Sequence, residues 1–414
     1  MTSSNNTRGR PGRRPMLQAA VSASALSTLP FPSIMRAQGA PLKVGCILPL
    51  SGVLAFVGTA TRRGTELAVK MYKEQGVNLE VSFVDTESKA ENGRIAAEKL
   101  IREGNSILVG AWDSGTTISA AQAAEAAKVP LVVNIASAPQ ITEQGFTQVF
   151  RNFVTAPQLV ANAVQRIKDL PRGGGFNPET AVLMHVNDTF GQSSRAAVAA
   201  LWDRLGVGIK ILDTISYDLR ARDLSVEVAK ARSTNADLVL PITRVNDAIL
   251  IVREMVKQDW NPMAIIAPGS PGAYEKAFTD ALGKYADDYI VCVPWWDPRQ
   301  PIAKSVIDRF TKEYPKERFE LNSGFGWEGI QVVADAFQRA GSSKPADLHA
   351  ALRSTNIESH VMFGGPIRFD DKGQNNNIGG VMLQNQGTEP RVILPGDAQQ
   401  AKPRLPHTPW SKRA

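Results

Sequence analysis

The stretch LKVGCILPLSG, residues 42–52, decides the fold. Its first nine residues form a short apolar run, and the run ends at a proline and a Ser-Gly pair, as a buried strand does where it enters a turn. Residues 60–74 then repeat apolar side chains at helical spacing, and residues 79–85 alternate as a second strand. A strand, a helix and another strand in this order predict a parallel pair of strands.

The same alternation continues along the chain of 414 residues, which is more than one hydrophobic core usually serves. Strands separated by helices indicate parallel sheets with helices on both faces. We therefore predict an α/β fold with two doubly wound parallel-sheet lobes. The further strands are predicted at residues 106–110, 130–134, 181–186, 210–215, 237–241, 264–267 and 290–293, and the last helices at 302–314 and 328–340.

The first 39 residues have the layout of an export signal. Their only charged side chains are arginines, a mildly apolar run follows from Met16 to Leu29, and small residues at 37–40 offer a cleavage site. The pair Arg13-Arg14 resembles a twin-arginine signal. The apolar run is shorter than the roughly 20 residues of a membrane span. We predict a periplasmic product exported by the twin-arginine route; a disordered basic tail is the alternative.

The formal net charge of +7 lies at the two ends of the chain. Residues 1–39 contribute five arginines, and residues 401–414 contribute four basic side chains and no acid, so the body between them is slightly acidic. A binding face for nucleic acid is therefore not predicted. The last stretch also contains three prolines, so residues 399–414 are predicted to form a loosely ordered basic tail.

Candidate ligand contacts lie in the loops that follow strands, because ligands of doubly wound sheets bind at the carboxyl ends of the strands. The first such loop, residues 49–58, presents Phe56 and Val57 as an apolar surface. This loop lacks the Gly-x-Gly-x-x-Gly fingerprint of dinucleotide binding. An ordinary strand-to-helix turn is the alternative explanation.

Two further loops carry hydroxyls. One contains Trp112, Asp113 and Ser114 and leads directly into a helix, and the next contains Ala136 and Ser137. Free N–H groups at a helix N-terminus attract anions, so two such loops on neighbouring strands predict a cradle for a carboxylate. The alternative is that these residues only cap helices, as Ser and Asp commonly do.

The sequence resembles the periplasmic leucine/isoleucine/valine-binding protein family, the soluble receptors of ABC importers, over nearly the whole mature chain. This resemblance implies a hinged fold of two lobes with three chain crossings. The motifs that carry it are LPLSG (48–52), VG (109–110), NF (152–153), NDTFG (187–191), FGWEG (325–329) and GPIRFD (365–370). The implied crossings lie near residues 151–155, 293–294 and 364–366, which gives a first lobe of 42–153 plus 294–364 and a second of 154–293 plus 365–398.

The resemblance also implies roles for residues and partners. A small carboxylate or amino acid is the expected ligand, an inner-membrane ABC permease is the expected partner, and a monomer without cofactor or metal is the expected state. The residues implied for the carboxylate cradle are Ser114, Ala136 and Ser137. Those implied for the cleft wall are Phe56, Val57 and Trp112, with Phe190 closing from the second lobe.

Two positions depart from the family pattern. The segment around Ser270, residues 268–271, has no acid where amino-acid binders pair with the ligand's ammonium, and Arg244 stands where the family commonly has a tyrosine. A guanidinium without that acid favours an organic or aromatic carboxylate over a branched-chain amino acid. Two alternatives stay open: Arg244 pairs with Asp247 or Asp113, or Asp113 replaces the ammonium partner.

The sequence offers no anchor for catalysis. There is no Gly-x-Ser-x-Gly motif, and the four histidines do not pair at metal-ligand spacing. Cys46 and Cys292 each lie in an apolar run and are predicted to be buried and unpaired. We predict a soluble substrate-binding component of an ABC importer that closes about its hinge and is not an enzyme. A ligand-sensing receptor module of the same fold is the alternative.

Overall fold

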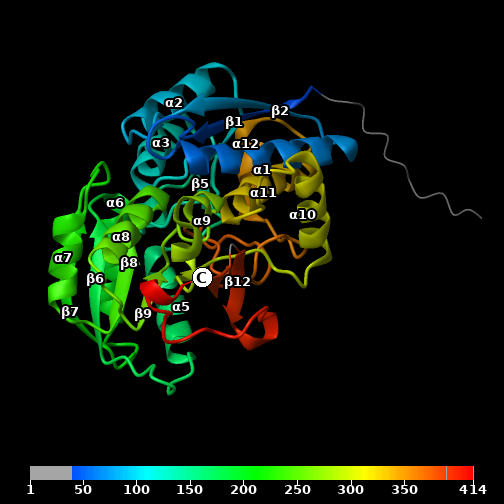
Figure 1. Ribbon diagram of the computed structural model, residues 1–414. Helices are drawn as coiled ribbons and strands as arrows, with labels where there is room; N and C mark the ends of the chain where they lie inside the picture. The colour runs from blue at the N-terminus through cyan, green and yellow to red at the C-terminus, as the bar shows by residue number, and fades with distance from the viewer. Residues whose placement is uncertain (1–39, 388, 414) are drawn as a thin grey trace, which may run out of the picture. The chain divides into compact units, whose positions relative to one another are not determined.

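A computed structural model describes residues 40–387 and 389–413 of the chain, and the predicted export signal lies outside them. The described residues contain a five-stranded and a seven-stranded sheet with helices packed against them (Figure 1). All strand pairs are parallel except those made by the last two strands. The predicted α/β class with two mostly parallel sheets is confirmed.

The first sheet is built around β1, which pairs with β2 on one side and β3 on the other. All of β1 except Lys43 is buried, as expected for a parallel strand covered on both faces. In the order β2-β1-β3-β4-β5, its strands are β1 (Leu42–Leu48), β2 (Leu79–Asp85), β3 (Ile107–Gly110), β4 (Leu131–Val133) and β5 (Val149–Arg151). The helices of this part are α1 (Ala55–Glu74), α2 (Asn92–Arg102), α3 (Ser114–Ala127), α4 (Gln140–Glu143), α10 (Pro301–Glu313), α11 (Leu321–Ala340) and α12 (Pro345–Arg353).

Helices α1 and α11 lie side by side although they are far apart in the sequence (Figure 1). Glycines permit this approach: a Cβ on Gly64 would come within 2.0 Å of Ser323 O, and one on Gly326 within 2.3 Å of Thr61 O. Residues 324–329 match the Gly-x-Gly-x-x-Gly spacing, yet they lie inside α11, where these glycines allow close helix packing. This contact attaches the late helix α11 to the first sheet.

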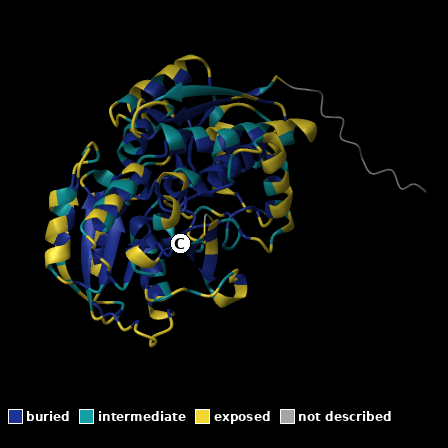
Figure 2. Cartoon of the chain, viewed as in Figure 1, coloured by how far each residue is buried: buried dark blue, intermediate teal, exposed yellow. Residues whose placement is uncertain are grey.

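The second sheet has the strand order β12-β11-β10-β9-β8-β6-β7. Its strands are β6 (Thr180–Val186), β7 (Lys210–Tyr217), β8 (Leu238–Ile242), β9 (Ala264–Pro268), β10 (Ile290–Val293), β11 (Val381–Gln386) and β12 (Glu389–Leu394). Its helices are α5 (Ala156–Lys168), α6 (Thr189–Leu201), α7 (Ser225–Ser233), α8 (Val245–Lys257) and α9 (Lys276–Leu282), with 3₁₀ turns at Gly283–Ala286, Gly396–Ala398 and Trp410–Lys412. The central strands β6, β8, β9 and β10 are almost wholly buried, whereas the edge strand β7 is largely exposed (Figure 2).

The chain passes between the two sheets more than once. The segment 152–155 connects β5 to α5, and the chain leaves the second sheet after β10. Residues 373–375 still pair with β5, since Arg151 N donates to Gly373 O at 2.7 Å and Asn375 N donates to Arg151 O at 3.0 Å. This pairing attaches residues 373–375 to the first sheet, and the lobe boundaries and the three crossings stay a prediction.

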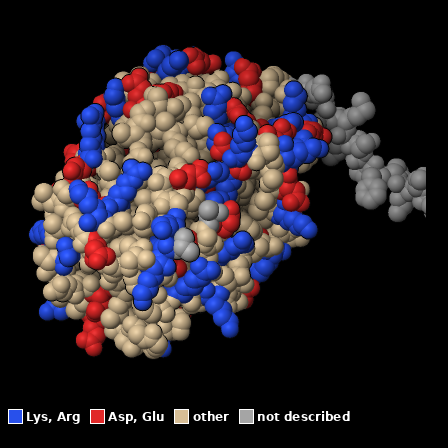
Figure 3. Space-filling view, viewed as in Figure 1, with Lys and Arg blue, Asp and Glu red and all other residues tan. Residues whose placement is uncertain are grey.

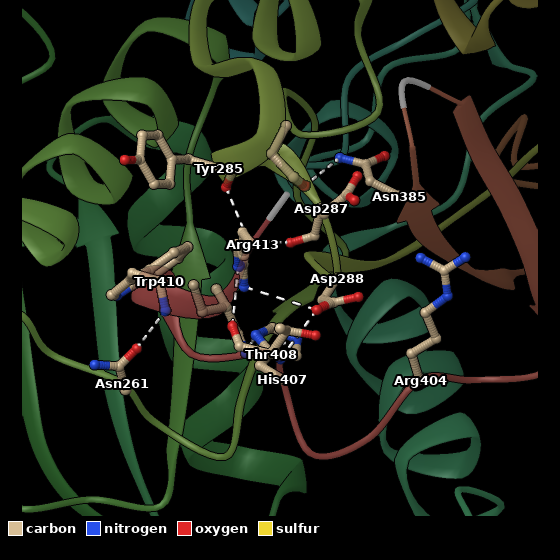
Figure 4. A network of polar contacts seen from close by, with 12 residues as sticks. Asn261, Tyr285, Asp287, Asp288, Asn385, Arg404, His407, Thr408, Trp410 and Arg413 are labelled. Atoms are coloured by element: carbon tan, nitrogen blue, oxygen red, sulfur yellow. Dashed lines mark hydrogen bonds and ion pairs between the residues drawn. The ribbon is translucent and has the colours of Figure 1, made fainter.

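The prediction of a loosely ordered tail is wrong for the described residues up to 413. Trp410 is buried, and its indole Nε1 donates to Trp260 O at 2.7 Å. Arg413 is also buried and donates to Asp287 O at 2.5 Å, while its Nη2 lies 3.9 Å from Asp288 Oδ2 (Figure 4). Burial of the Trp410 ring explains the difference. The apolar surface that it removes from water offsets the conformational entropy that the tail loses on ordering, and prolines and charged residues alone provide no such gain.

Other sequence expectations concern the surface and the cysteines. Basic and acidic side chains are interspersed over most of the face that Figure 3 draws. Among the described residues, no helix is long and apolar enough to span a membrane.

Cys46 in β1 and Cys292 in β10 are free and buried, as predicted, and burial raises the pKa of each thiol to about 12.

Candidate ligand site

A cavity with an empty volume of about 470 Å³, part of it open to solvent, lies where loops of the two sheets meet. Most of its wall is apolar, with aromatic side chains from both sheets. Seven of the ten side chains predicted from the sequence border it: Trp112, Asp113, Ser114, Ala136, Ser137, Phe190 and Arg244. The remaining wall residues are Ile135, Phe153, Leu159, Gly269, Pro271, Tyr274, Val293, Pro294, Leu321 and Asn322.

Ser114 and Ser137, which are predicted to form a carboxylate cradle, both border the cavity. Ser114 opens α3, and the preceding Asp113 caps this helix by accepting from Thr116 N at 3.2 Å. Ser114 Oγ accepts from Ala138 N at 3.3 Å, which joins the loops after β3 and β4. Ser137 Oγ is buried and has no hydrogen-bond partner among the described residues. An unpartnered hydroxyl beside a helix N-terminus is suited to a carboxylate.

Arg151 shapes the loop that carries Ser137. Its guanidinium is fully buried and donates through Nη1 to Ala138 O at 2.7 Å and Ala136 O at 3.3 Å. Its Nη2 donates to Thr142 Oγ1 at 2.6 Å. Burial lowers the pKa of Arg151 to about 9, but this is still high enough for the group to be charged near neutral pH. Sequence reasoning identified Arg151 only as the edge of a chain crossing.

Two cavity residues hold unusual backbone conformations. Trp112 has a φ of +74° and Ala136 a φ of +143°, which are uncommon for residues with a side chain. Such strain concentrates at sites where the fold presents groups to a ligand. The indole of Trp112 is further fixed by donating from Nε1 to Asn322 Oδ1 at 2.8 Å.

Arg244 connects the two sheets at the cavity. It precedes α8, and its Nη2 donates to Asp113 Oδ1 at 2.8 Å, while Nη1 lies 2.6 Å from Asp188 Oδ2. Of the two partners left open by the sequence, its side chain pairs with Asp113; Asp247 instead accepts from the Arg244 backbone N at 2.9 Å. Burial disfavours the charge, but Asp188 and Asp113 outweigh it and hold the pKa of Arg244 above its usual value.

Aromatic rings flank this guanidinium. The Arg244 Cζ lies 5.1 Å from the centroid of the Phe190 ring and 5.9 Å from that of Trp112. Phe190 lies in the first turn of α6, which Asp188 caps by accepting from Gly191 N at 2.9 Å. Cation–π contact and ion pairing therefore stabilise the same guanidinium, and this fixes the position of Phe190 at the cavity.

Phe56, Val57 and Ser270 are not brought to the cavity. Helix α1 begins at Ala55, five residues earlier than predicted, so Phe56 and Val57 belong to the helix and pack on the hydrophobic core. The Ser270 hydroxyl donates to Thr243 O at 2.9 Å and accepts from Thr243 N at 2.7 Å. Its role here is to hold the loop whose neighbouring residues face the cavity.

Sequence reasoning also missed several wall residues. Leu321 and Asn322 were not assigned because α11 was predicted to begin at residue 328, whereas it begins at Leu321. Tyr274 lies three residues beyond the segment considered after β9. The sequence did contain a signal for Tyr274. The whole loop after β9, and not only residues 268–271, follows the carboxyl end of a strand, where ligands of such sheets bind.

Two lobes of doubly wound sheet, with a cavity between their loops, define a type I periplasmic binding protein. The chain belongs to the periplasmic binding protein family, whose model matches residues 41–385.

Individual relatives agree with this assignment. The chain is 23% identical over 385 residues to the Leu/Ile/Val-binding protein homolog 8 of Brucella abortus, covering 90% of this chain and 95% of that protein. A leucine-binding protein structure from Thermotoga maritima is 22% identical with a TM-score of 0.74, covering 85% of this chain and 97% of that one. A solute-binding protein of an ABC transporter from Rhodopseudomonas palustris, in complex with benzoate, is 18% identical with a TM-score of 0.73, covering 88% and 100%.

Proposed function

We propose that this protein is the soluble substrate-binding component of an ABC importer and captures a small apolar carboxylate without converting it. The observation that carries the proposal is an apolar, aromatic cavity that contains the unpartnered Ser137 hydroxyl, in a loop hydrogen-bonded to Ser114 at the N-terminus of α3. A carboxylate at this point would receive hydrogen bonds from hydroxyls and favourable charge from the helix. The apolar remainder of the ligand would fill the cavity.

The wall favours an aromatic or other organic acid over a plain branched-chain amino acid. Trp112, Phe153, Phe190 and Tyr274 present rings to the cavity, and ring faces and edges stack well on an aromatic ligand. Arg244 contributes less to this choice than its sequence position suggested, because Asp113 and Asp188 already balance its charge. We therefore propose a ligand with one carboxylate. Among the structural relatives, one is described as leucine-binding and another holds benzoate.

Contacts between the two sheets across the cavity support the proposal that the lobes close about a hinge. Besides Arg244 and Asp113, Asn246 Nδ2 donates to Val53 O at 3.2 Å, joining the start of α8 to the loop after β1. Contacts that exist only in the closed form stabilise it, and a ligand held by both lobes adds to them. The closed form is the one that a membrane permease would recognise, after twin-arginine export to the periplasm.

Residues 40–414, purified without ligand, test the proposal in a thermal-shift screen of carboxylates and amino acids, with calorimetry on the hits. A true ligand at 100 times its dissociation constant should stabilise the protein by about 2.7 kcal/mol. We expect aromatic acids to stabilise it more than leucine or valine. Preference for leucine would overturn the ligand class. Failure of every carboxylate, or turnover of a bound one, would overturn the proposed function.

A further inference from the structure

The three connections between the two sheets meet at one buried carboxyl, that of Glu328 in α11. Its Oε2 accepts from Asn152 Nδ2 at 2.8 Å, and Asn152 lies in the connection after β5. Its Oε1 accepts from Val361 N at 2.9 Å and from Met362 N at 2.7 Å, in the connection that leads to β11. The connection after β10 joins the same segment, because Asp297 N donates to Val361 O at 2.8 Å. The segments about which two lobes would turn are therefore attached, directly or through one neighbour, to a single side chain.

His360 contacts the same carboxyl, and both of its ring nitrogens face acceptors. Nδ1 lies 3.1 Å from Glu328 Oε1, and Nε2 lies 2.8 Å from Gly365 O. The carboxyl receives hydrogen bonds from two backbone N–H groups and an amide, so it acts as an ionised acceptor. A neutral imidazole carries one N–H and can donate only one of the two bonds. Donating both requires the doubly protonated ring, paired with the carboxylate of Glu328.

The surroundings of the ring determine at which pH it loses the second proton. Burial of His360 disfavours its charge, but Glu328, Gly365 O and Asp297 together outweigh burial and hold the pKa of the ring above its usual value of 6.5. Asp297 is itself paired with Arg299, whose Nη2 lies 2.9 Å from Asp297 Oδ2. The charged ring therefore stabilises the fold fully below pH 6.5, and this contribution is lost as the pH rises through the folded-state pKa.

We propose that His360 and Glu328 form a proton-dependent latch, which holds the connections between the sheets while His360 is doubly protonated and loosens them when it loses a proton. A neutral ring must give up either Glu328 Oε1 or Gly365 O, so one buried acceptor loses its donor. Histidine is suited to such a switch, because modest changes in its surroundings move its titration across neutral pH. The inference goes beyond the proposed function, since it concerns the ligand-free protein and holds for any ligand.

NMR on residues 40–414 labelled with ¹⁵N-histidine tests the protonation directly. The chain has four histidines, and His360→Gln identifies the signals of His360. We expect both ring nitrogens of His360 to carry a proton at about pH 6, and one of them to lose it with a midpoint above 6.5. A single neutral tautomer at about pH 6, or a midpoint below 6.5, would overturn the latch. If His360→Gln does not fold, replacing the other three histidines one at a time leaves the signals of His360 as the remaining set.

Hydrogen exchange of the ligand-free protein tests the loosening of the connections. The amides of Val361 and Met362 donate to Glu328 Oε1, so their protection factors report the latch. Each factor is divided by that of the β8 amides, because global stability also varies with pH. Across the His360 titration we expect this ratio to fall about 10-fold, the effect of one hydrogen bond to a charged group. His360→Gln should show no such fall.

His349→Gln is the matched control, because His349 lies on α12 and its Nε2 contacts Thr147 O, away from the latch. This variant should keep the full pH dependence. A pH-independent ratio in the unmodified protein would overturn the latch even if His360 titrates as expected. Neither measurement uses a ligand, so a failed latch leaves the proposed function standing, and failure of every carboxylate to bind leaves the latch standing.

Discussion

Arg244 and Asp113 join the two halves of the ligand site, with Arg244 Nη2 lying 2.8 Å from Asp113 Oδ1. Asp113 caps α3, which carries Ser114, and Arg244 immediately precedes α8 on the second sheet. Both side chains border the cavity. The contact that holds the halves together therefore borders the cavity itself, and under the proposed function ligand binding and closure would be coupled through the same two residues.

Replacing Arg244 with methionine should destabilise the protein by about 3 kcal/mol, because it leaves the Asp113 and Asp188 carboxylates without their counter-ion. We choose the lower end of the usual range for a buried pair, since the two carboxylates are partly exposed. Urea unfolding measures the change. The triple variant with Asp113→Asn and Asp188→Asn should recover part of the loss. Equal unfolding midpoints for Arg244→Met and the unmodified protein would rule out this role.

Ser137→Ala should weaken binding of the carboxylate ligand about 10-fold or more and leave the melting temperature of the ligand-free protein nearly unchanged. The hydroxyl has no partner among the described residues, so the folded state without ligand loses nothing, whereas a carboxylate loses a charge-assisted hydrogen bond. Calorimetry and a thermal melt separate the two effects. Ser194→Ala is the control, since Ser194 is also buried and unpartnered but lies away from the cavity wall. Unchanged affinity in Ser137→Ala would contradict the cradle.

Trp410→Ala should lower the free energy of unfolding by about 3 to 5 kcal/mol, because a large buried ring and its hydrogen bond to Trp260 O are lost. Ligand affinity should not change, since Trp410 does not border the cavity. Denaturant unfolding and calorimetry measure the two quantities. Lys412→Ala, an exposed neighbour in the same turn, should be neutral. A neutral Trp410→Ala would show that the tail adds no stability.

Stability should fall as the pH rises from about 4.5 through 8, in part because of Glu320. Burial raises the pKa of this carboxyl from 4.5 to about 8, so between these values the folded state binds the proton more tightly than the unfolded state does. Its contribution is therefore fully present below the unfolded pKa and is lost as the pH passes the folded one. Urea midpoints at several pH values should show a flatter profile in Glu320→Gln. Parallel profiles would contradict the assignment.

The spacing of apolar residues along the sequence, together with residue type, was enough to predict the alternation of strands and helices and the α/β class with two sheets. It also located the loops that carry Ser114 and Ser137. These features are local, because a strand followed by a helix places its connecting loop at the carboxyl edge of the sheet in any doubly wound fold. The two free cysteines were likewise predictable from their apolar surroundings.

Only the tertiary structure decided which distant residues meet there. Asn322 reaches Trp112, Arg151 holds the Ser137 loop, Asp188 shares Arg244 with Asp113, and Trp410 packs beside Trp260. The helix starts at Ala55 and Leu321 also differ from the predicted residues 60 and 328, because close packing through glycine begins helices earlier than local propensity would. Local pattern encodes which segments form strands and helices, whereas the partners of a buried charge or ring depend on segments brought together only when the sheets assemble.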